Sequence, residues 1–465
     1  MIMTKLIGVI MAAGLGKRMN SKTPKVLHTL MGKPLIEFPL KALRELNPDG
    51  ILVILGNQIE LIKEQLGERY TYILQDPPLG TGDALKQILP YLREYLDNAV
   101  LVVPGDAPFI NSNLLKEFTY SHQNSGCQAS ILTTIMENPS GYGRIIRDEN
   151  GSIVRIIEDS DLTSGQKNIK EVNASVYIFR ALALLKYLPQ IDNQNQQGEY
   201  YLTDIFEKMT VDKQCISIFC YQNTPEMLMG INNRKDLVKA HKLLKEKIIE
   251  GFLDSGVTII DPESTYIEDN VSIEQDVTIY PFSFLMGNTV IKSGSIIGPS
   301  VLIKNSVIGN GCKIYYSEIE EATLEQGVKV GPFSHLRPGT YVKQGAKIGN
   351  FAELKKSVIG ENTRVSHVSY LGDSNVGDGV NIGAGTIVCN YDGEKKHPTV
   401  IEDEVFVGSN STLIAPLRIG KGAYIAGGSV INNDVPPEAL ALGRGIQVIK
   451  EGWAKKRKER RKNNG

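Results

Sequence analysis

The first group of residues in this sequence that could do chemistry follows a glycine-rich turn, "AAGLGKRM", with Arg18 inside it and Lys25 shortly after. Backbone N–H groups of such a turn can surround a polyanion, and two cations beside it suit a triphosphate whose charge must be offset during attack. The turn lacks the full dinucleotide fingerprint and the Walker lysine pair, so its glycines alone are a weak signal. A plain strand-to-turn connection with basic surface residues is the competing interpretation.

An acidic residue follows another apolar run. Asp106 in "VVPGDAP" could hold Mg²⁺, which takes few protein ligands and keeps its waters and phosphates. Asn232 in "GINNR" could supply a second oxygen. Read without the rest of the chain, Asp106 would be a helix N-cap and Asn232 a turn residue.

The second group surrounds His367 in "SHVSYLGD". Most isolated histidines are structural or lie on the surface, but a coil of about 18 residues would stack Arg337 and Lys355 beside this one. Two cations can bind a phosphate, while the imidazole takes a proton from an attacking amine. This pattern favours a phosphorylated amine as substrate.

The elements that must position the first group are short β-branched runs separated by amphipathic segments, as in "KLIGVIMAAG", "GILVILGN" and "NAVLVVPGD". Continuous apolar strands that alternate with helices predict a parallel sheet covered on both faces. In such sheets ligands bind at the carboxyl ends of the strands, where Arg18, Lys25 and Asp106 follow.

After about residue 253 the period changes. Aliphatic-Gly pairs recur at multiples of six, for example at Gly331 and Gly349, and this hexapeptide period is typical of a parallel β-helix with the aliphatic residue inside. Ile382 and Ile387 are expected to fill the interior. The period breaks at "CNYDGEKKHP", which predicts a polar loop outside the coils. A structural rod or a trimerising module is the competing interpretation of this half.

These patterns divide the chain at two boundaries. We expect a catalytic α/β domain over 1–231, a charged amphipathic linker helix over 232–252 and a β-helix domain with a basic C-terminal tail over 253–465. The tail is expected to form a helix that closes the site and meets an anionic coenzyme; the alternative is a solvated tail that binds nucleic acid.

Composition argues against several other classes. The net charge is −1, which gives no overall field for nucleic acid or a membrane surface, and no apolar run is long enough to cross a bilayer. The five cysteines lack metal-binding spacing, so we expect reduced thiols and a cytoplasmic protein.

The first half resembles the sugar-nucleotide pyrophosphorylases, through "AAGLGKRM…PKVLH", "LGTGDA", "PGDAP", "GYGRI", "IIEDSD" and "GEYYLTD" in order. The resemblance implies that Arg18 and Lys25 act on the reacting phosphates and that Asp106 and Asn232 hold Mg²⁺. It further implies contacts with UTP and the sugar phosphate from Ala12, Ala13, Gly14, Gln75, Gly80, Thr81, Gly143, Glu158 and Asn173. The family usually has Thr at the position of Lys17 and often Asn-Thr-Gly where this chain has Asn173-Ala174-Ser175.

The second half resembles the hexapeptide-repeat acyltransferases, through "NFAELKKSVIG", "YLGD", "NIGAGTIVCNYDG", "VFVGSNSTLIAP" and "KEGW". Over almost the whole chain the sequence is similar to the bacterial bifunctional N-acetylglucosamine-1-phosphate uridylyltransferase/glucosamine-1-phosphate acetyltransferase family. That family implies a Rossmann-like nucleotidyltransferase domain, a left-handed β-helix and a homotrimer. It implies His367 as general base, an amino-sugar phosphate site of Arg337, Lys355, Tyr370 and Asn381, and an acetyl-CoA site of Ala384, Asn390, Tyr391, Ser409, Gly427 and Arg444.

The expected function is therefore two reactions in one enzyme. Glucosamine 1-phosphate is acetylated from acetyl-CoA, and N-acetylglucosamine 1-phosphate then takes UMP from UTP to give UDP-N-acetylglucosamine, a precursor of bacterial cell-wall polymers. One alternative is a monofunctional sugar-1-phosphate nucleotidylyltransferase whose β-helix is only structural. The other is a non-enzymatic scaffold that binds nucleotides.

Overall fold

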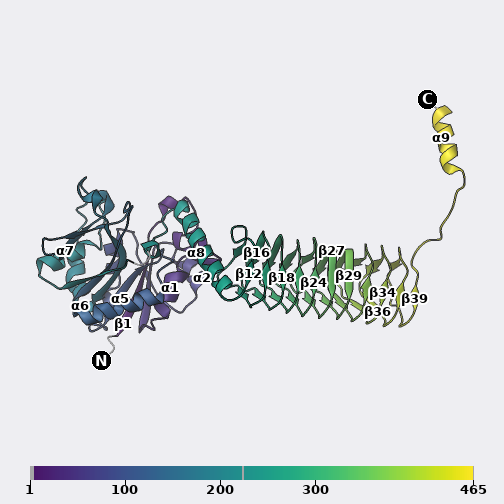
Figure 1. The fold of residues 1–465 in the computed structure, drawn as a ribbon, viewed down its shortest axis with the longest axis horizontal. Coiled ribbons are helices and arrows are strands. Elements are labelled where there is room, and N and C mark those ends of the chain that lie inside the picture. The colour runs from purple at the N-terminus through teal and green to yellow at the C-terminus, as the bar shows by residue number, and fades with distance from the viewer. Residues whose placement is uncertain (1–4, 223–224, 464–465) are drawn as a thin grey trace. The chain divides into compact units, whose positions relative to one another are not determined.

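The computed structural model describes residues 5–222 and 225–463, and the chain divides into two compact units, Met1–Leu244 and Lys245–Gly465 (Figure 1). The division falls within helix α8 (Arg234–Asp254), where the sequence predicted a linker helix over 232–252.

The sheet of the first unit has a parallel centre. Strand β1 (Leu6–Ala12) pairs in parallel with β4 (Gly50–Leu55) on one side and β6 (Ala99–Pro104) on the other, and β5 (Thr71–Leu74) continues beyond β4. Strands β1, β4 and β6 are largely buried because a hydrophobic core lies on each face. Helices α1 (Glu37–Arg44) and α5 (Ser112–Ser125) pack into one core, and α3 (Thr81–Lys86), α6 (Ala181–Tyr187) and α7 (Asp204–Val211) pack into the other.

The predicted parallel sheet is mixed, because β10 (Glu171–Arg180) runs antiparallel between β6 and β7 (Ala129–Ile135). A parallel strand needs a crossover, usually an α-helix. The chain between β7 and β10 instead forms β8 (Arg144–Arg147), β9 (Ile153–Ile157) and short 3₁₀ turns. Strand β11 (Ile216–Cys220) pairs in parallel with β7 at the sheet edge.

The second unit is a parallel β-helix, as Figure 1 shows from β12 (Thr258–Ile259) to β39 (Leu440–Ala441). Leu336 pairs with Leu354 and Leu354 with Leu371, so successive coils advance by 18 and 17 residues. The strands that carry the site are β22 (Glu318–Glu320), β25 (His335–Leu336), β27 (Lys347–Lys355), β29 (Arg364–Gly372), β31 (Asn381–Ile382), β32 (Ile387–Cys389), β34 (Phe406–Val407) and β37 (Tyr424–Ile425). The two architectures confirm the fold class predicted from the sequence.

Aliphatic residues of the repeat fill the interior, with one correction. Ile382 is buried as predicted, but Ile387 is 40% exposed and Val388 takes the interior position. The reason is strand alternation: Val388 lies in register with Leu413 inside the coil, which turns Ile387 outward.

The expectation that all cysteines are reduced is also corrected, because Cys127 and Cys215 form a disulfide across 88 residues. Cys220, Cys312 and Cys389 are free thiols. Among the described residues, no helix combines the length and apolar character needed to cross a membrane.

Candidate active sites

The glycine-rich turn after β1 packs directly on Lys25. Gly16 has φ 61°, in the left-handed region that glycine adopts without strain, and a Cβ there would lie 2.8 Å from Lys25 Cβ. Ala12 and Ala13 are buried at the end of the strand, whereas Gly14 is exposed beyond it. The turn therefore places its exposed backbone beside the base of the Lys25 side chain.

Four side chains predicted to act on phosphates or metal converge here. Lys25 Nζ forms an ion pair and hydrogen bond with Asp106 Oδ2 and donates to Asn232 Oδ1 at 3.2 Å. Arg18 Nη2 donates to the same Asn232 oxygen at 3.2 Å. Lys25 and Asp106 keep only 14% and 18% of their side-chain surface exposed, so their charges interact across a partly dry site.

Asn232 reaches this cluster because a helix cap holds it. Asn233 caps α8: its Oδ1 accepts from the backbone N–H of Asp236, whose carboxylate in turn accepts from the N–H groups of Asn232 and Asn233. The neighbouring Ile231 N–H donates to Asp106 O at 2.9 Å. The local sequence "NNRKD" thus fixes Asn232 against the end of β6.

Gly143, Glu158 and Asn173, predicted to bind the sugar phosphate, also lie together. Asn173 N–H donates to Gly143 O at 2.9 Å, and a Cβ on Gly143 would lie 3.5 Å from Glu158 Oε2. Burial raises the pKa of Glu158, whose Oε1 accepts from Thr203 Oγ1 at 3.0 Å. A carboxyl group in this environment is a suitable partner for sugar hydroxyls.

The departure at Ser175 has a structural consequence. Ser175 has φ 58°, the left-handed region where the family often has glycine, and its N–H donates to Asn173 Oδ1 at 3.0 Å. The pairing of β10 with β7 shifts register between Asn173 and Tyr177, and Asn173 Nδ2 donates to Tyr177 Oη at 2.6 Å. The β-bulge therefore keeps the Asn173 side chain in place despite the substitution.

Gln75 and the Gly80-Thr81 turn form the third part of this site. Gln75 is buried and its Nε2 donates to Gly80 O at 3.0 Å and to Asp83 Oδ2 at 2.8 Å. Gly80 has φ 115°, and a Cβ there would lie 2.6 Å from Tyr200 O. Only glycine fits this turn.

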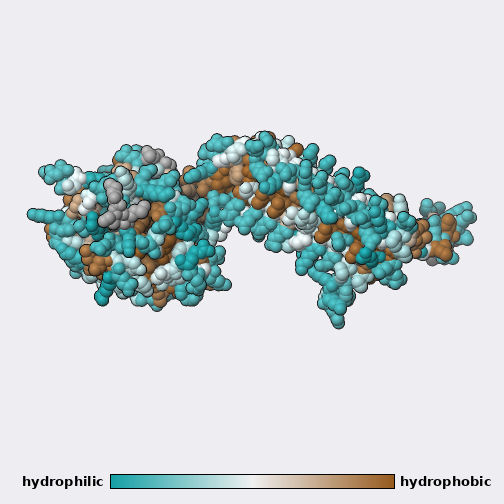
Figure 2. Space-filling view, turned by 90° about the horizontal axis from the view of Figure 1, so that it is seen from below, coloured by the Kyte–Doolittle hydropathy of each residue, from teal (hydrophilic) through white to brown (hydrophobic). Residues whose placement is uncertain are grey.

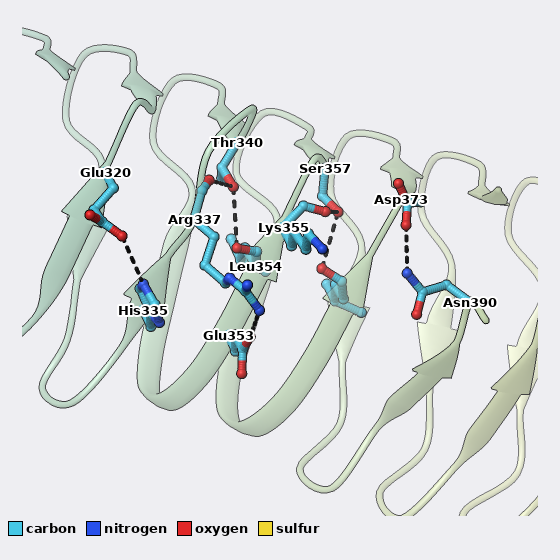
Figure 3. A network of polar contacts seen from close by, with 11 residues as sticks. Glu320, His335, Arg337, Thr340, Glu353, Leu354, Lys355, Ser357, Asp373 and Asn390 are labelled. Atoms are coloured by element: carbon cyan, nitrogen blue, oxygen red, sulfur yellow. Dashed lines mark hydrogen bonds and ion pairs between the residues drawn. The ribbon is translucent and has the colours of Figure 1, made fainter. Parts of the chain in front are cut away.

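In the β-helix, three cations meet on one face. Arg337 Nη1 donates to Glu353 Oε1 at 2.9 Å, and Lys355 lies one strand further along the same face (Figure 3). Lys396 from the polar loop comes to Lys355, and the side-chain contact with Lys396, together with the charges of Lys396 and Arg337, lowers the pKa of Lys355. Cationic side chains gathered in this way are suitable partners for an anion such as a phosphate. Lys396 was not predicted from the sequence. Its only signal there is the pair Lys395-Lys396 in the polar loop outside the coils.

His367 lies on β29, three residues before Tyr370 on the same strand. Its Nδ1 is 2.9 Å from Oδ1 of Asn350, its register partner on β27. Sequence reasoning also missed Asn350, although it lies 17 residues before His367, one coil earlier.

The polar loop is held by short contacts. Asn390 Nδ2 donates to Asp373 Oδ2 at 2.5 Å, as Figure 3 shows. Asp392 accepts from the N–H groups of Glu394 and Lys395 and pairs with His397, and these bonds lower the pKa of Asp392. Tyr391 is 59% exposed at the tip.

Ala384, Ser409, Gly427 and Arg444, four of the residues predicted to bind acetyl-CoA, lie on successive coils, while Asn390 and Tyr391 belong to the polar loop. Asn410 N–H donates to Ala384 O at 2.7 Å and Gly428 N–H to Ser409 O at 2.8 Å, so Ala384 and Ser409 mark successive coils. Arg444 Nη1 donates to Gly427 O at 2.8 Å. Gly385 N–H donates to Val368 O at 2.8 Å, which places His367 one coil before Ala384.

Two predicted groups are not joined to these clusters. Asn381 lies in register with Arg364 and Phe406, before the corner that separates this strand from the Tyr370 face. The basic tail forms helix α9 (Trp453–Asn463), whose described side chains are exposed.

Comparison with known proteins identifies the family. The nucleotidyl transferase family matches residues 7–224, and the bacterial transferase hexapeptide family (six repeats) matches residues 398–433. The Bifunctional protein GlmU of Thermoanaerobacter pseudethanolicus is 45% identical over 98% of this chain and 99% of its own length. That of Fervidobacterium nodosum is 46% identical over 98% of both chains, and that of Thermotoga petrophila is 46% identical over 97% of this chain and 99% of its own. The chain belongs to the bifunctional GlmU family.

Membership of the GlmU family joins the two units in one function. The chain is a bifunctional transferase of UDP-N-acetylglucosamine synthesis, with a nucleotidyltransferase unit and a hexapeptide acetyltransferase unit. Bifunctional GlmU proteins that match this chain over nearly its full length disfavour the alternative of a purely structural β-helix.

Proposed function

We propose how the described residues divide the two reactions. In the β-helix, Arg337, Lys355 and Lys396 bind the phosphate of glucosamine 1-phosphate, and Tyr370 and Asn381 bind its sugar. His367 takes a proton from the amine, which attacks the thioester carbonyl of acetyl-CoA and releases the CoA thiolate. Ala384, Asn390, Tyr391, Ser409, Gly427 and Arg444 line the acetyl-CoA site. The convergence of three cations beside the histidine strand carries this proposal.

In the first unit, a phosphate oxygen of N-acetylglucosamine 1-phosphate attacks the α-phosphorus of UTP in line, and pyrophosphate leaves. Arg18 and Lys25 offset the charge on the leaving group, while the turn at Ala12, Ala13 and Gly14 surrounds the phosphates. Gln75, Gly80 and Thr81 hold the base, and Gly143, Glu158 and Asn173 hold the sugar.

The residues present fit a magnesium ion. The Lys25 ammonium contacts both Asp106 Oδ2 and Asn232 Oδ1, so the two oxygens already converge on one cation position. Oxygen ligands of this kind are those that Mg²⁺ uses together with substrate phosphates. Asp106 and Asn232 would hold the ion, and it would supply positive charge against the phosphate oxygens.

The parent protein tests the division directly. Acetyl transfer from acetyl-CoA to glucosamine 1-phosphate and UMP transfer from UTP to N-acetylglucosamine 1-phosphate are assayed separately, with Mg²⁺ or with excess chelator. We expect both activities, with only UMP transfer lost in chelator and restored by Mg²⁺. A parent with UMP transfer alone would make the β-helix structural, and a parent with neither activity would leave a nucleotide-binding scaffold.

An exposed aromatic ladder supports assembly of several copies, and we expect a trimer. Tyr316, Phe333 and Phe351 lie at one corner of successive coils, with ring centroids 5.7 and 5.4 Å apart, and each is at least 44% exposed. Hydrophobic residues gather over the first coils of the β-helix in Figure 2. An apolar surface of this length is typical of an interface between subunits. Asn381 lies across the corner from the cation face, so a neighbouring copy would complete the acetyl-transfer site.

The change Phe333→Arg is expected to break this assembly. Sedimentation velocity should show a mass near three chains for the parent and one chain for the variant, because a charge in the ladder cannot be buried unpaired. Acetyl transfer should fall with the assembly, while UMP transfer remains. Tyr120→Arg, which alters an equally exposed tyrosine on α5, should change neither. A parent that sediments as a single chain would contradict the trimer.

A further inference from the structure

We propose that Asn350 is a positioning residue for acetyl transfer, which holds His367 in the tautomer whose Nε2 can take the proton of the amine. The inference rests on the proposed role of His367 and adds a residue to it. Its basis is the 2.9 Å contact between Asn350 Oδ1 and His367 Nδ1, made by residues in direct register on β27 and β29.

The contact determines which ring nitrogen carries the proton. A neutral imidazole has one N–H donor and one acceptor, and the amide oxygen of asparagine only accepts. His367 Nδ1 must therefore donate its proton to Asn350 Oδ1. This leaves Nε2 with a free lone pair, and a proton from the amine can go only there.

The fold holds both partners at the same corner of consecutive coils. Asn350 precedes Phe351, which has φ 59°, and His367 precedes Val368, which has φ 40°. Phe351 stacks on Phe333 with ring centroids 5.4 Å apart, and its N–H donates to Phe333 O at 3.0 Å. Ser369 Oγ donates to the His367 carbonyl at 2.8 Å. The hydrogen bond therefore spans two backbones that are fixed independently of it.

An amide differs from a carboxylate in what it does to the base. A carboxylate would stabilise the imidazolium by its charge, whereas an uncharged amide orients the ring without adding charge. The charged residues on the packed strands have other neighbours: Glu353 pairs with Arg337, Lys355 faces Lys396, and Lys347 lies in register with Arg364. The strand on the other side, β31, brings Asn381 and no charge. Asn350 is thus the partner that sets the ring.

Two variants separate positioning from mere structure. Asn350→Ala should lower kcat for acetyl transfer about 10- to 100-fold, because the ring can turn and change tautomer, with KM for both substrates changed less than about threefold. Asn350→Asp keeps the acceptor and adds charge, so most of the rate should remain at high pH. The acidic limb of its kcat/KM profile should move to higher pH by about one unit. Titration of the amino sugar itself is common to all variants and cancels from the comparison.

The controls keep the outcomes distinct. Asn375→Ala alters an exposed asparagine on another face of the same β-helix and should change neither rate nor profile. UMP transfer in the same preparations reports intact protein, and sedimentation reports the assembly. A kcat within twofold of the parent for Asn350→Ala, or an unmoved limb for Asn350→Asp, would overturn the inference. Acetyl transfer by His367→Ala is measured in parallel. If that variant kept full activity, the proposed role of His367 would be wrong, and the failure would belong to the proposed function.

Discussion

Replacing His367 by alanine is expected to lower acetyl transfer to glucosamine 1-phosphate at least about 100-fold, the scale of losing a general base. UMP transfer should stay within twofold of the parent, because its residues belong to the other compact unit. The loss should appear in kcat more than in KM. The proposed phosphate-binding residues Arg337, Lys355 and Lys396 are unchanged in this variant, and the His367 ring contacts Asn350 instead of them.

The exposed position of His367 makes this variant easy to interpret. Removing an exposed side chain leaves no core cavity, so the folded population should be unchanged and thermal unfolding should match the parent. His367→Gln, which keeps a polar side chain without a basic nitrogen, should lose as much activity as His367→Ala. Retention of more than a tenth of the acetyl transfer by both variants would show that the amine is deprotonated by another group or by solvent.

The fold of the second unit could be predicted because its signal is periodic. Each six residues repeat one inward aliphatic position, and Ile348, Ile359, Val407 and Ile419 are all buried as the period requires. The period fails where a loop interrupts it. Tyr370 pairs with Ile387, but Ile387 pairs with Thr412, which lies 25 residues later. Val388, and not Ile387, therefore takes the inward position of this strand, which the six-residue period alone does not predict.

The same limit applies to the site. Residue types indicated Arg337, Lys355 and His367 as site residues. Their partners, however, are determined by the register between coils and by the polar loop outside the coils. Asn350 is in contact with His367 only because the coil advances by 17 residues at this point. Lys396 reaches Lys355 only because a β-bridge between Tyr391 and Lys396 folds the loop back. Neither geometry can be derived from spacing alone.

In the first unit, strand ends indicated where Arg18, Lys25 and Asp106 would lie, since parallel strands bring their carboxyl ends to one edge. The antiparallel direction of β10 was missed because an apolar strand pattern does not record strand direction; the short strands and turns that stand before it in place of a helix were the available signal. The placement of Asn232, 126 residues beyond Asp106, depends on the cap of α8. The disulfide between Cys127 and Cys215 joins residues with no spacing signal.

Replacing Lys25 by methionine is the second change with a large expected effect, and its signature separates catalysis from structure. UMP transfer should fall about 10²- to 10³-fold, as for loss of a group that stabilises developing charge in a partly dry site. Yet Lys25 also holds the two oxygens, on Asp106 and Asn232, that the metal would take. Its ammonium is therefore expected to compete with Mg²⁺ before substrate binds.

The Mg²⁺ requirement of UMP transfer should consequently move in opposite directions in two variants. In Lys25→Met the Mg²⁺ concentration that gives half-maximal rate should decrease, because the competing cation is gone, although the maximal rate drops. In Asp106→Asn that concentration should increase, because a neutral amide binds the ion more weakly. Acetyl transfer, measured in the same samples, should be unaffected in both. A Lys25→Met enzyme with near-normal UMP transfer and only a lower unfolding temperature would show that the ion pair is structural, because removal of a stabilising contact predicts no opposite change in metal requirement.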